Sequence, residues 1–135
     1  EAGLAGFAIM RDKLQAVVDS GNENPYLLGN LARIYAVLGD KATSYRLADN
    51  SLAGMRTDAL GLPAALETKA IVHMLGDDKA TAIALLREAQ SMPIAYGPTP
   101  AMLRNDPLWD SLRGEPGFEA LTQVDGAPLK TSPDP

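Results

Sequence analysis

Residues 25–53 read PYLLGNLARIYAVLGDKATSYRLADNSLA, and residues 62–90 read LPAALETKAIVHMLGDDKATAIALLREAQ. In both stretches apolar residues recur every three or four positions on each side of a glycine–aspartate turn, which is the period of an amphipathic α-helix. A turn this short forces the second helix to run antiparallel beside the first. The two stretches therefore predict two helical hairpins, with helices at residues 25–38, 41–53, 62–75 and 78–90.

The rest of the chain also favours helices. Alanine and leucine supply 40 residues, while valine and isoleucine, which strands prefer, supply 10. A further helix is predicted over residues 4–19, because apolar residues recur there at three- and four-residue steps, at Leu4, Phe7, Met10, Leu14 and Val17 or Val18. Near the C-terminus, Thr99, Asp106 and Glu115 each precede a proline, a pattern typical of short proline-initiated helices. The predicted fold class is all-α.

Composition limits the classes of function. A chain of 135 residues is long enough for one ordinary domain. A net charge of −5 and the absence of clustered lysines and arginines argue against nucleic-acid binding. No apolar stretch is long enough to span a membrane, and no cysteine is present, so we expect neither membrane insertion nor thiol chemistry. Because the chain begins at Glu1 without a methionine, we expect a piece of a longer protein.

An internal repeat relates the two hairpins. Small or aromatic residues recur at an offset of 38 positions, pairing Ala32 with Ala70, Tyr35 with His73, Ser44 with Ala82 and Ser51 with Ala89. The small residues let two helix backbones approach closely. This pattern resembles the tetratricopeptide repeat (TPR), a helix–turn–helix unit of about 34 residues. The resemblance covers residues 4–95 and implies an α-α superhelix of stacked antiparallel hairpins.

The segment LRNDPLWDSLRGEPGF, residues 103–118, resembles the end of the repeat array in many bacterial signalling proteins. The last helix pair of a solenoid has no following neighbour, so a cap must cover its apolar face. We expect residues 1–124 to form one domain, with a helical cap at residues 99–124 and a flexible tail at residues 125–135. The side chains expected to cover the last hairpin are Trp109, Leu112, Phe118 and Leu121. The resemblance implies a larger bacterial protein and leaves its compartment, cytoplasmic or periplasmic, open.

No catalytic or cofactor motif is found. The sequence has no phosphate-binding loop, dinucleotide glycine pattern, HExxH motif or calcium loop. His73 is the only histidine and occupies a position where the repeat has an aromatic core residue, so we expect it to pack. A metal pair of His73 with Asp77 lacks a third ligand nearby. We therefore expect no enzyme, no cofactor and no metal.

In TPR proteins the first helix of each hairpin lines the concave face. Carried over to this sequence, the resemblance gives a partner-binding set of Tyr26, Asn30, Arg33, Glu67, Ile71 and Met74. Asn30 matches the asparagine with which such repeats hold a peptide backbone or carboxylate. Gly29 and Glu67 stand where the lysines of a carboxylate clamp would be, which leaves Arg33 as the only cation. The competing interpretation is that these six positions are ordinary solvated helix surface.

The function implied by the resemblance is a non-catalytic scaffold for protein–protein interaction, which binds a partner protein or peptide or regulates its parent chain. Two alternatives stay open. One is a small-molecule sensor with a pocket between the last repeat and the cap. The other is a homodimerisation module that uses the exposed end face near residues 4–19.

Overall fold

The computed structural model describes residues 2–92 and 98–123, and these ranges are all-helical, with no strand. In chain order the helices are α1 (Ala2–Asp19), α2 (Pro25–Val37), α3 (Lys41–Gly54), α4 (Gly61–Leu75), α5 (Lys79–Gln90), α6 (Pro100–Asn105), the 3-10 helix η1 (Pro107–Leu112) and α7 (Pro116–Leu121). The five long helices begin and end within two residues of the predicted bounds. The expected tail at residues 125–135, and residue 124 before it, lie outside the described residues.

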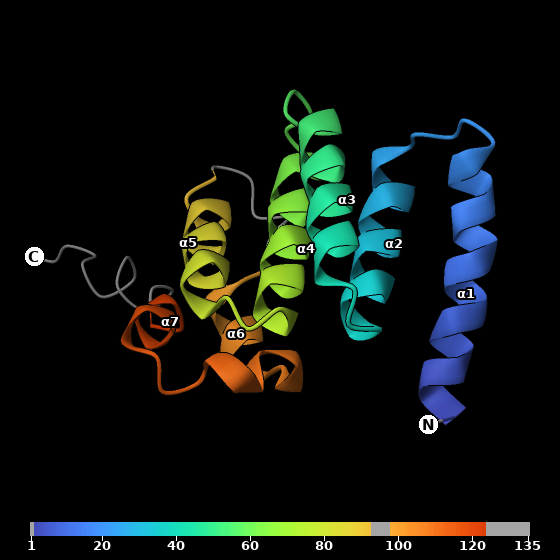
Figure 1. Ribbon diagram of the computed structural model, residues 1–135. Coiled ribbons are helices and arrows are strands. Elements are labelled where there is room, and N and C mark those ends of the chain that lie inside the picture. Colours follow the sequence, from blue (N-terminus) through green and yellow to red (C-terminus); the bar gives the residue numbers. More distant parts are fainter. Residues whose placement is uncertain (1, 93–97, 124–135) are drawn as a thin grey trace, which may run out of the picture.

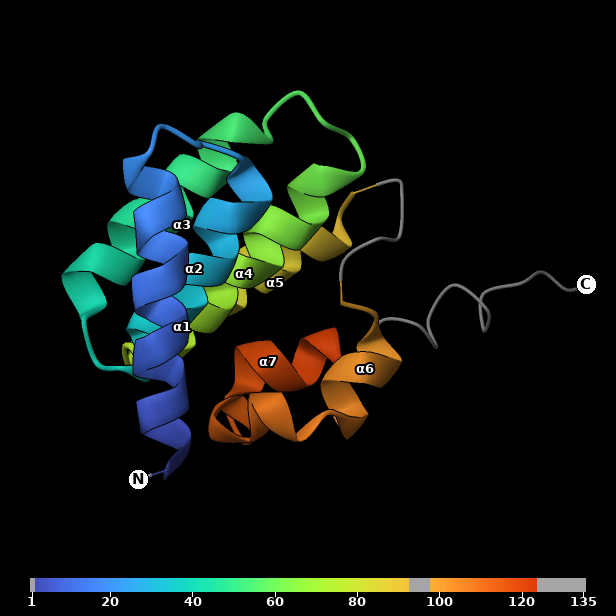
Figure 2. The ribbon, with the colours of Figure 1, turned by 90° about the vertical axis from the view of Figure 1, so that its right-hand side faces the viewer.

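The long helices lie side by side in chain order, as Figure 1 shows. Helix α2 pairs with α3 and α4 pairs with α5, so the two predicted antiparallel hairpins are confirmed. Helix α4 also packs on α2 and α3, which joins the hairpins, and α1 packs on α2. In the turned view the short helices α6, η1 and α7 lie together beside the stack (Figure 2). The N-terminal end of α1 extends toward the same side. We call these three short helices the cap.

The second helix of each hairpin starts with the same tetrapeptide, Asp-Lys-Ala-Thr, at residues 40–43 and 78–81. Asp40 caps α3 and Asp78 caps α5, each accepting a hydrogen bond from the N–H of the threonine three residues later, at 3.1 and 3.3 Å. The residue before each aspartate has left-handed backbone geometry, with φ of 90° at Gly39 and 65° at Asp77. The second turn therefore places an aspartate where the first has a glycine, and the 38-residue offset continues through both turns.

Buried apolar side chains form two clusters. The first lies between α2 and α3 and comprises Leu28, Leu31, Ala32, Leu47, Ala48 and Val72. The second extends from α4 and α5 into the cap, where Trp109, Leu112, Phe118 and Leu121 are 1%, 0%, 0% and 4% exposed. The prediction that these four residues cover the last hairpin is confirmed. The small residues at the repeat positions are also fully or almost fully buried, as close helix packing requires.

Helix α1 differs from the other four long helices, because none of its residues is buried. Leu14 and Val18 pack partly against the first cluster, but Phe7 and Met10 remain 38% and 50% exposed. Figure 1 shows the reason: the N-terminal part of α1 extends past the end of α2. The apolar stripe therefore stays exposed along that part of the helix.

Two of the three proline-initiated helices have the expected side-chain cap. The Thr99 hydroxyl accepts a hydrogen bond from the Met102 N–H at 3.1 Å, and Asp106 accepts one from the Leu108 N–H at 2.9 Å. Glu115 stands at the N-cap of α7 as predicted, but its side chain makes no capping hydrogen bond. Its carboxylate is carried on a longer side chain than the aspartate and threonine groups that favour this position.

Candidate functional site

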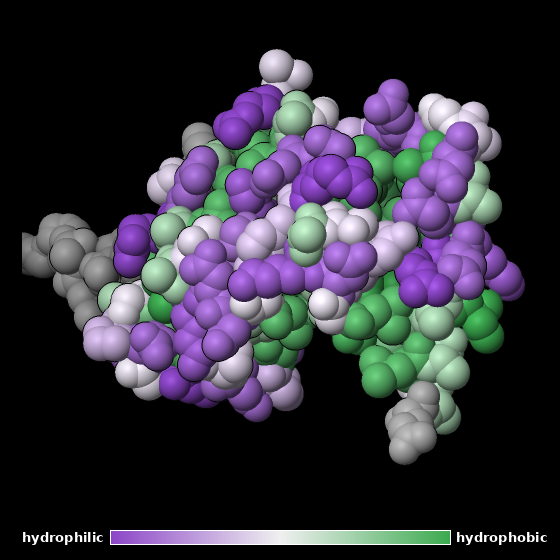
Figure 3. Space-filling view, in the orientation of Figure 1, coloured by the Kyte–Doolittle hydropathy of each residue, from purple (hydrophilic) through white to green (hydrophobic). Residues whose placement is uncertain are grey.

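An open groove of about 400 Å³ lies between the N-terminal half of α1 and the cap, with α2 and α4 as its floor. The space-filling view shows hydrophobic surface on both sides of the hollow at this place (Figure 3). The residues that line the groove are Phe7, Met10 and Leu14 of α1, Asn30, Arg33, Ile34 and Val37 of α2, Ile71 and Leu75 of α4, and Leu108 of η1.

Large apolar side chains dominate this lining and remain accessible. Those that are more than one-third exposed come from all four elements: Phe7, Met10, Val37, Leu75 and Leu108. A single exposed apolar residue is ordinary, whereas a contiguous exposed apolar patch on a folded domain marks an interaction site. The groove is therefore the strongest candidate site among the described residues.

The repeat explains how the floor of the groove is built. Arg33 and Val37 of α2 correspond to Ile71 and Leu75 of α4 at the 38-residue offset. Residues four apart lie on one face of a helix, so each helix presents matching positions on the same side of the stack. The hairpin repeat thus places two equivalent helix faces next to each other, and α1 and η1 form the two walls.

Three of the six expected site residues, Asn30, Arg33 and Ile71, line the groove. Ile71 is only 3% exposed and forms part of the floor. Tyr26 is 55% exposed and lies at the start of α2, where it borders a separate, smaller depression together with Asn30 and residues of α4. Met74 is wrong as a surface residue, because it is 6% exposed and belongs to the second buried cluster. At the next position, Leu75 takes its place in the groove.

The sixth residue, Glu67, is half-buried near Arg33 and Asp106. Burial raises the pKa of the Glu67 carboxyl, the nearby Asp106 carboxylate raises it further, and the Arg33 guanidinium acts in the opposite direction. The Arg33 side chain makes no hydrogen bond and no ion pair within 4 Å to any residue in the ranges 2–92 and 98–123. Arg33 is the one formally charged side chain among the residues that line the groove.

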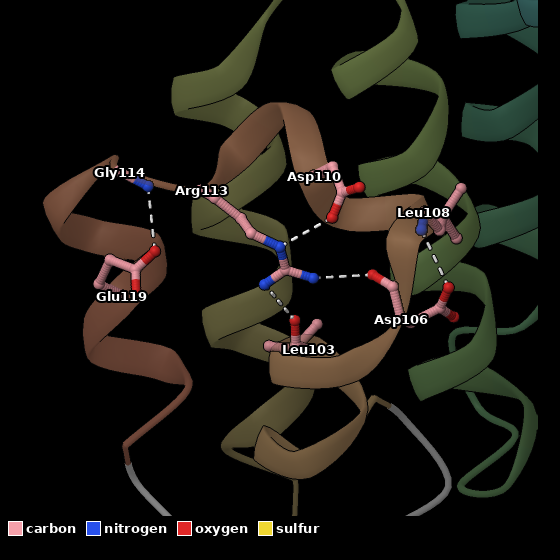
Figure 4. Close-up of polar contacts among 7 residues, drawn as sticks. All are labelled: Leu103, Asp106, Leu108, Asp110, Arg113, Gly114 and Glu119. Carbon is pink, nitrogen blue, oxygen red and sulfur yellow. Dashed lines mark hydrogen bonds and ion pairs between the residues drawn. The ribbon is translucent and has the colours of Figure 1, made fainter.

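Leu108 is the groove residue that the cap contributes, and a network of hydrogen bonds in the cap holds it in place (Figure 4). The Arg113 guanidinium donates to the Leu103 carbonyl at 2.9 Å, to the Asp106 carbonyl at 2.9 Å and to the Asp110 carboxylate at 2.8 Å. The Asp106 side chain in turn caps η1 through the Leu108 N–H. These bonds join the end of α6 to η1, so the position of Leu108 depends on the Arg113 network.

His73 packs as expected. Its ring stacks on Tyr45 with the centroids 3.9 Å apart, and its Nδ1 lies 3.1 Å from the Asp78 carboxylate. The carboxylate beside His73 is therefore that of Asp78, and not that of Asp77, whose pairing with His73 the sequence already disfavoured. Hydrogen bonds from Thr81 and His73 lower the pKa of Asp78. No group of three potential metal ligands occurs among the described residues.

Sequence reasoning missed seven groove residues, namely Phe7, Met10, Leu14, Ile34, Val37, Leu75 and Leu108. Val37 and Leu75 carried a usable signal, because each ends the first helix of a hairpin at the same repeat position. The α1 residues carried none, since an apolar stripe is equally compatible with complete burial.

Comparison with known protein families, with curated proteins and with solved structures gives no match for this chain. Within residues 2–92 and 98–123, no helix combines the length and the hydropathy of a membrane span. The interpretation of the groove rests on its own geometry and chemistry.

Proposed function

We propose that this chain is a non-catalytic protein-interaction module, with a TPR-like superhelical arrangement, that binds a segment of a partner protein in the groove. The observation that carries the proposal is the groove lining: accessible large apolar side chains from four separate elements gather at one place. The same helix face that a TPR-like array would present to a partner, the first helix of each hairpin, forms the groove floor.

A partner segment fits this groove better than a small molecule enclosed by the fold. The sensor alternative places its ligand between the last hairpin and the cap, but Trp109, Leu112 and Phe118 occupy that space and are at most 1% exposed. The groove, by contrast, is open along α1 and the cap, and its apolar side chains remain in contact with solvent. Burial of these side chains by a partner would supply the hydrophobic driving force for binding.

Homodimerisation is the second candidate function. Ile9 and Val17 of α1 are 59% and 40% exposed and do not line the groove. A second copy packed on α1 would cover them. Sedimentation equilibrium separates this candidate from the first, because Ile9→Asp should dissociate such a dimer.

The test is selection of binders from a random peptide library displayed on phage, followed by fluorescence anisotropy with the selected peptides. Met10→Asp places a charge in the groove wall, and the adjacent Ile9→Asp places the same charge on α1 outside the groove. Both residues are at least half-exposed, so both variants should fold. We expect Met10→Asp to weaken binding about tenfold or more and Ile9→Asp to leave it unchanged. Equal affinities for the two variants, or no selected peptide at all, would contradict the proposal.

A further inference from the structure

Building on the proposed function of the groove, we propose that its partner segment is an amphipathic α-helix whose apolar stripe carries one acidic side chain, and that this carboxylate pairs with Arg33. The inference adds the conformation and the charge of the partner to the location of the site. It rests on the polar groups that the groove offers and on those that it lacks.

The lining favours a helix over an extended segment. Only Asn30 and Arg33 among the groove residues have polar side chains. An extended segment pressed into this groove would bring its backbone N–H and C=O groups against apolar side chains and leave most of them without partners, at a considerable free-energy cost. A helix satisfies these groups internally and presents only side chains, which is the helix-in-groove mode of recognition.

Arg33 determines the charge of the partner. Its guanidinium is exposed and forms no hydrogen bond or ion pair to any described residue. A partner that covers it with apolar groups would remove water from the charge and leave only the nearby half-buried Glu67 to compensate it in part, which is costly. An aspartate or glutamate on the partner would accept two hydrogen bonds from the planar guanidinium. Asn30, one helical turn earlier and also exposed, offers a further amide donor to the same carboxylate.

Other charged groups near Arg33 must be considered. Glu67 is half-buried beside it, Asp106 lies close to Glu67, and Arg11 of α1 is already paired with Asp12 at 2.8 Å. Glu67 competes with a partner carboxylate for Arg33, because its charge already interacts with the Arg33 guanidinium. Because the guanidinium has five donors, it can serve Glu67 and a partner carboxylate together. Glu67→Gln removes the competing negative charge, so this variant should bind an acidic partner more tightly.

The experiment uses the peptides from the display library whose binding Met10→Asp abolishes. We expect most of them to become helical when bound, as seen by circular dichroism, and to carry an aspartate or glutamate within the apolar stripe. In the tightest peptide, replacement of that acid by glutamine should weaken binding about tenfold, the effect of losing one charge-assisted contact, and replacement by lysine should weaken it further. Arg33→Glu should reverse the order, so that the lysine peptide binds more tightly than the acidic one, and Glu67→Gln should tighten the acidic peptide.

Each result separates the inference from the proposed function. If groove-dependent peptides bind equally well with acid, glutamine or lysine, or stay extended when bound, the inference is wrong and the proposed function stands. If the library yields no peptide that Met10→Asp weakens, the proposed function itself fails. A reversal of the charge preference in Arg33→Glu supports the pairing, and an unchanged preference overturns it.

Discussion

At one end of the stack α5 packs against α7, and the indole of Trp109 is buried with Leu112 and Phe118 beneath it. At the other end α1 packs on α2 with no buried residue of its own, and its N-terminal part extends past its neighbour. Both ends are helical and both carry an apolar stripe. They differ in what covers that stripe: the cap covers the first, and solvent reaches much of the second.

This contrast connects stability with function. Burial at the capped end makes that end the anchor of the fold. The loosely packed end leaves Phe7 and Met10 available as the wall of a groove whose opposite wall, Leu108, comes from the cap. Regions of low local stability are where binding surfaces commonly lie, because side chains that pack completely against their own chain cannot contact a partner.

The largest change in stability is expected when the buried indole at the capped end is removed. Trp109→Ala should lower the free energy of unfolding by about 3–5 kcal/mol, because the indole is fully buried and the cap cannot fill the cavity left behind. Ile9→Ala at the α1 end should change it by less than about 0.5 kcal/mol. Urea unfolding followed by far-ultraviolet circular dichroism measures both. Similar losses in the two variants would mean that the two ends do not differ.

A smaller effect should come from the polar network of the cap. Arg113→Met keeps the length of the side chain but removes its bonds to two backbone carbonyls, and we expect a loss of about 1–3 kcal/mol. Trp109 fluorescence during urea unfolding reports on this change, because Trp109 is the only tryptophan. The control is Arg46→Met on the exposed surface of α3, which should leave the midpoint unchanged. An unchanged midpoint for Arg113→Met as well would mean that the network does not stabilise the cap.

A side-chain hydrogen bond between α1 and the hairpins provides a finer test. The Tyr35 hydroxyl donates to the Gln15 side-chain oxygen at 2.8 Å. Tyr35→Phe should cost about 0.5–1.5 kcal/mol and should appear mainly as faster amide hydrogen exchange in α1, with α3 and α4 unaffected. Tyr26→Phe, at an exposed tyrosine of the same helix, is the matched control. Exchange that accelerates equally in all helices would show that α1 does not open separately.

The smallest change in stability is expected at Glu67 of α4, the helix that forms part of the groove floor. Burial raises the folded-state pKa of Glu67 above its unfolded-state value, so the native state loses stability as the pH rises through these two values. Glu67→Gln should therefore stabilise the protein at pH 7, by less than about 1 kcal/mol since Arg33 partly compensates the charge, and the gain should disappear at pH 3. Thermal unfolding at both pH values tests this, with Glu88→Gln on the exposed surface of α5 as control. A gain of equal size at pH 3 would contradict the assigned cause.

Local patterns predicted most of the fold. Apolar periodicity and the two glycine–aspartate turns located the five long helices. The burial of Trp109 and Phe118 also followed from the sequence, because a stacked array needs a cover at its last hairpin. Membership of the TPR family and the binding function stay predictions that the structure does not test.

The groove could be predicted only in part. Asn30, Arg33 and Ile71 followed from helix-face geometry, but Met74 and Leu75 both lie at helical spacing from Ile71, and periodicity alone does not decide which of the two faces the core. The 38-residue correspondence of Leu75 with Val37 would have decided it. The walls depend on how far α2 extends beside α1 and on where the cap folds back, and both are set by contacts between residues distant in the chain.

The central claim is that α1, the two hairpins and the cap together form one binding surface. The most direct measurement is the set of backbone amide chemical-shift changes, in two-dimensional NMR spectra, when a selected peptide is added. We predict changes at Phe7, Met10, Arg33, Val37, Leu75 and Leu108, positions scattered along the sequence and gathered only by the fold, with the outward surfaces of α3 and α5 unaffected. Changes confined to one helix, or centred on α3 and α5, would contradict it.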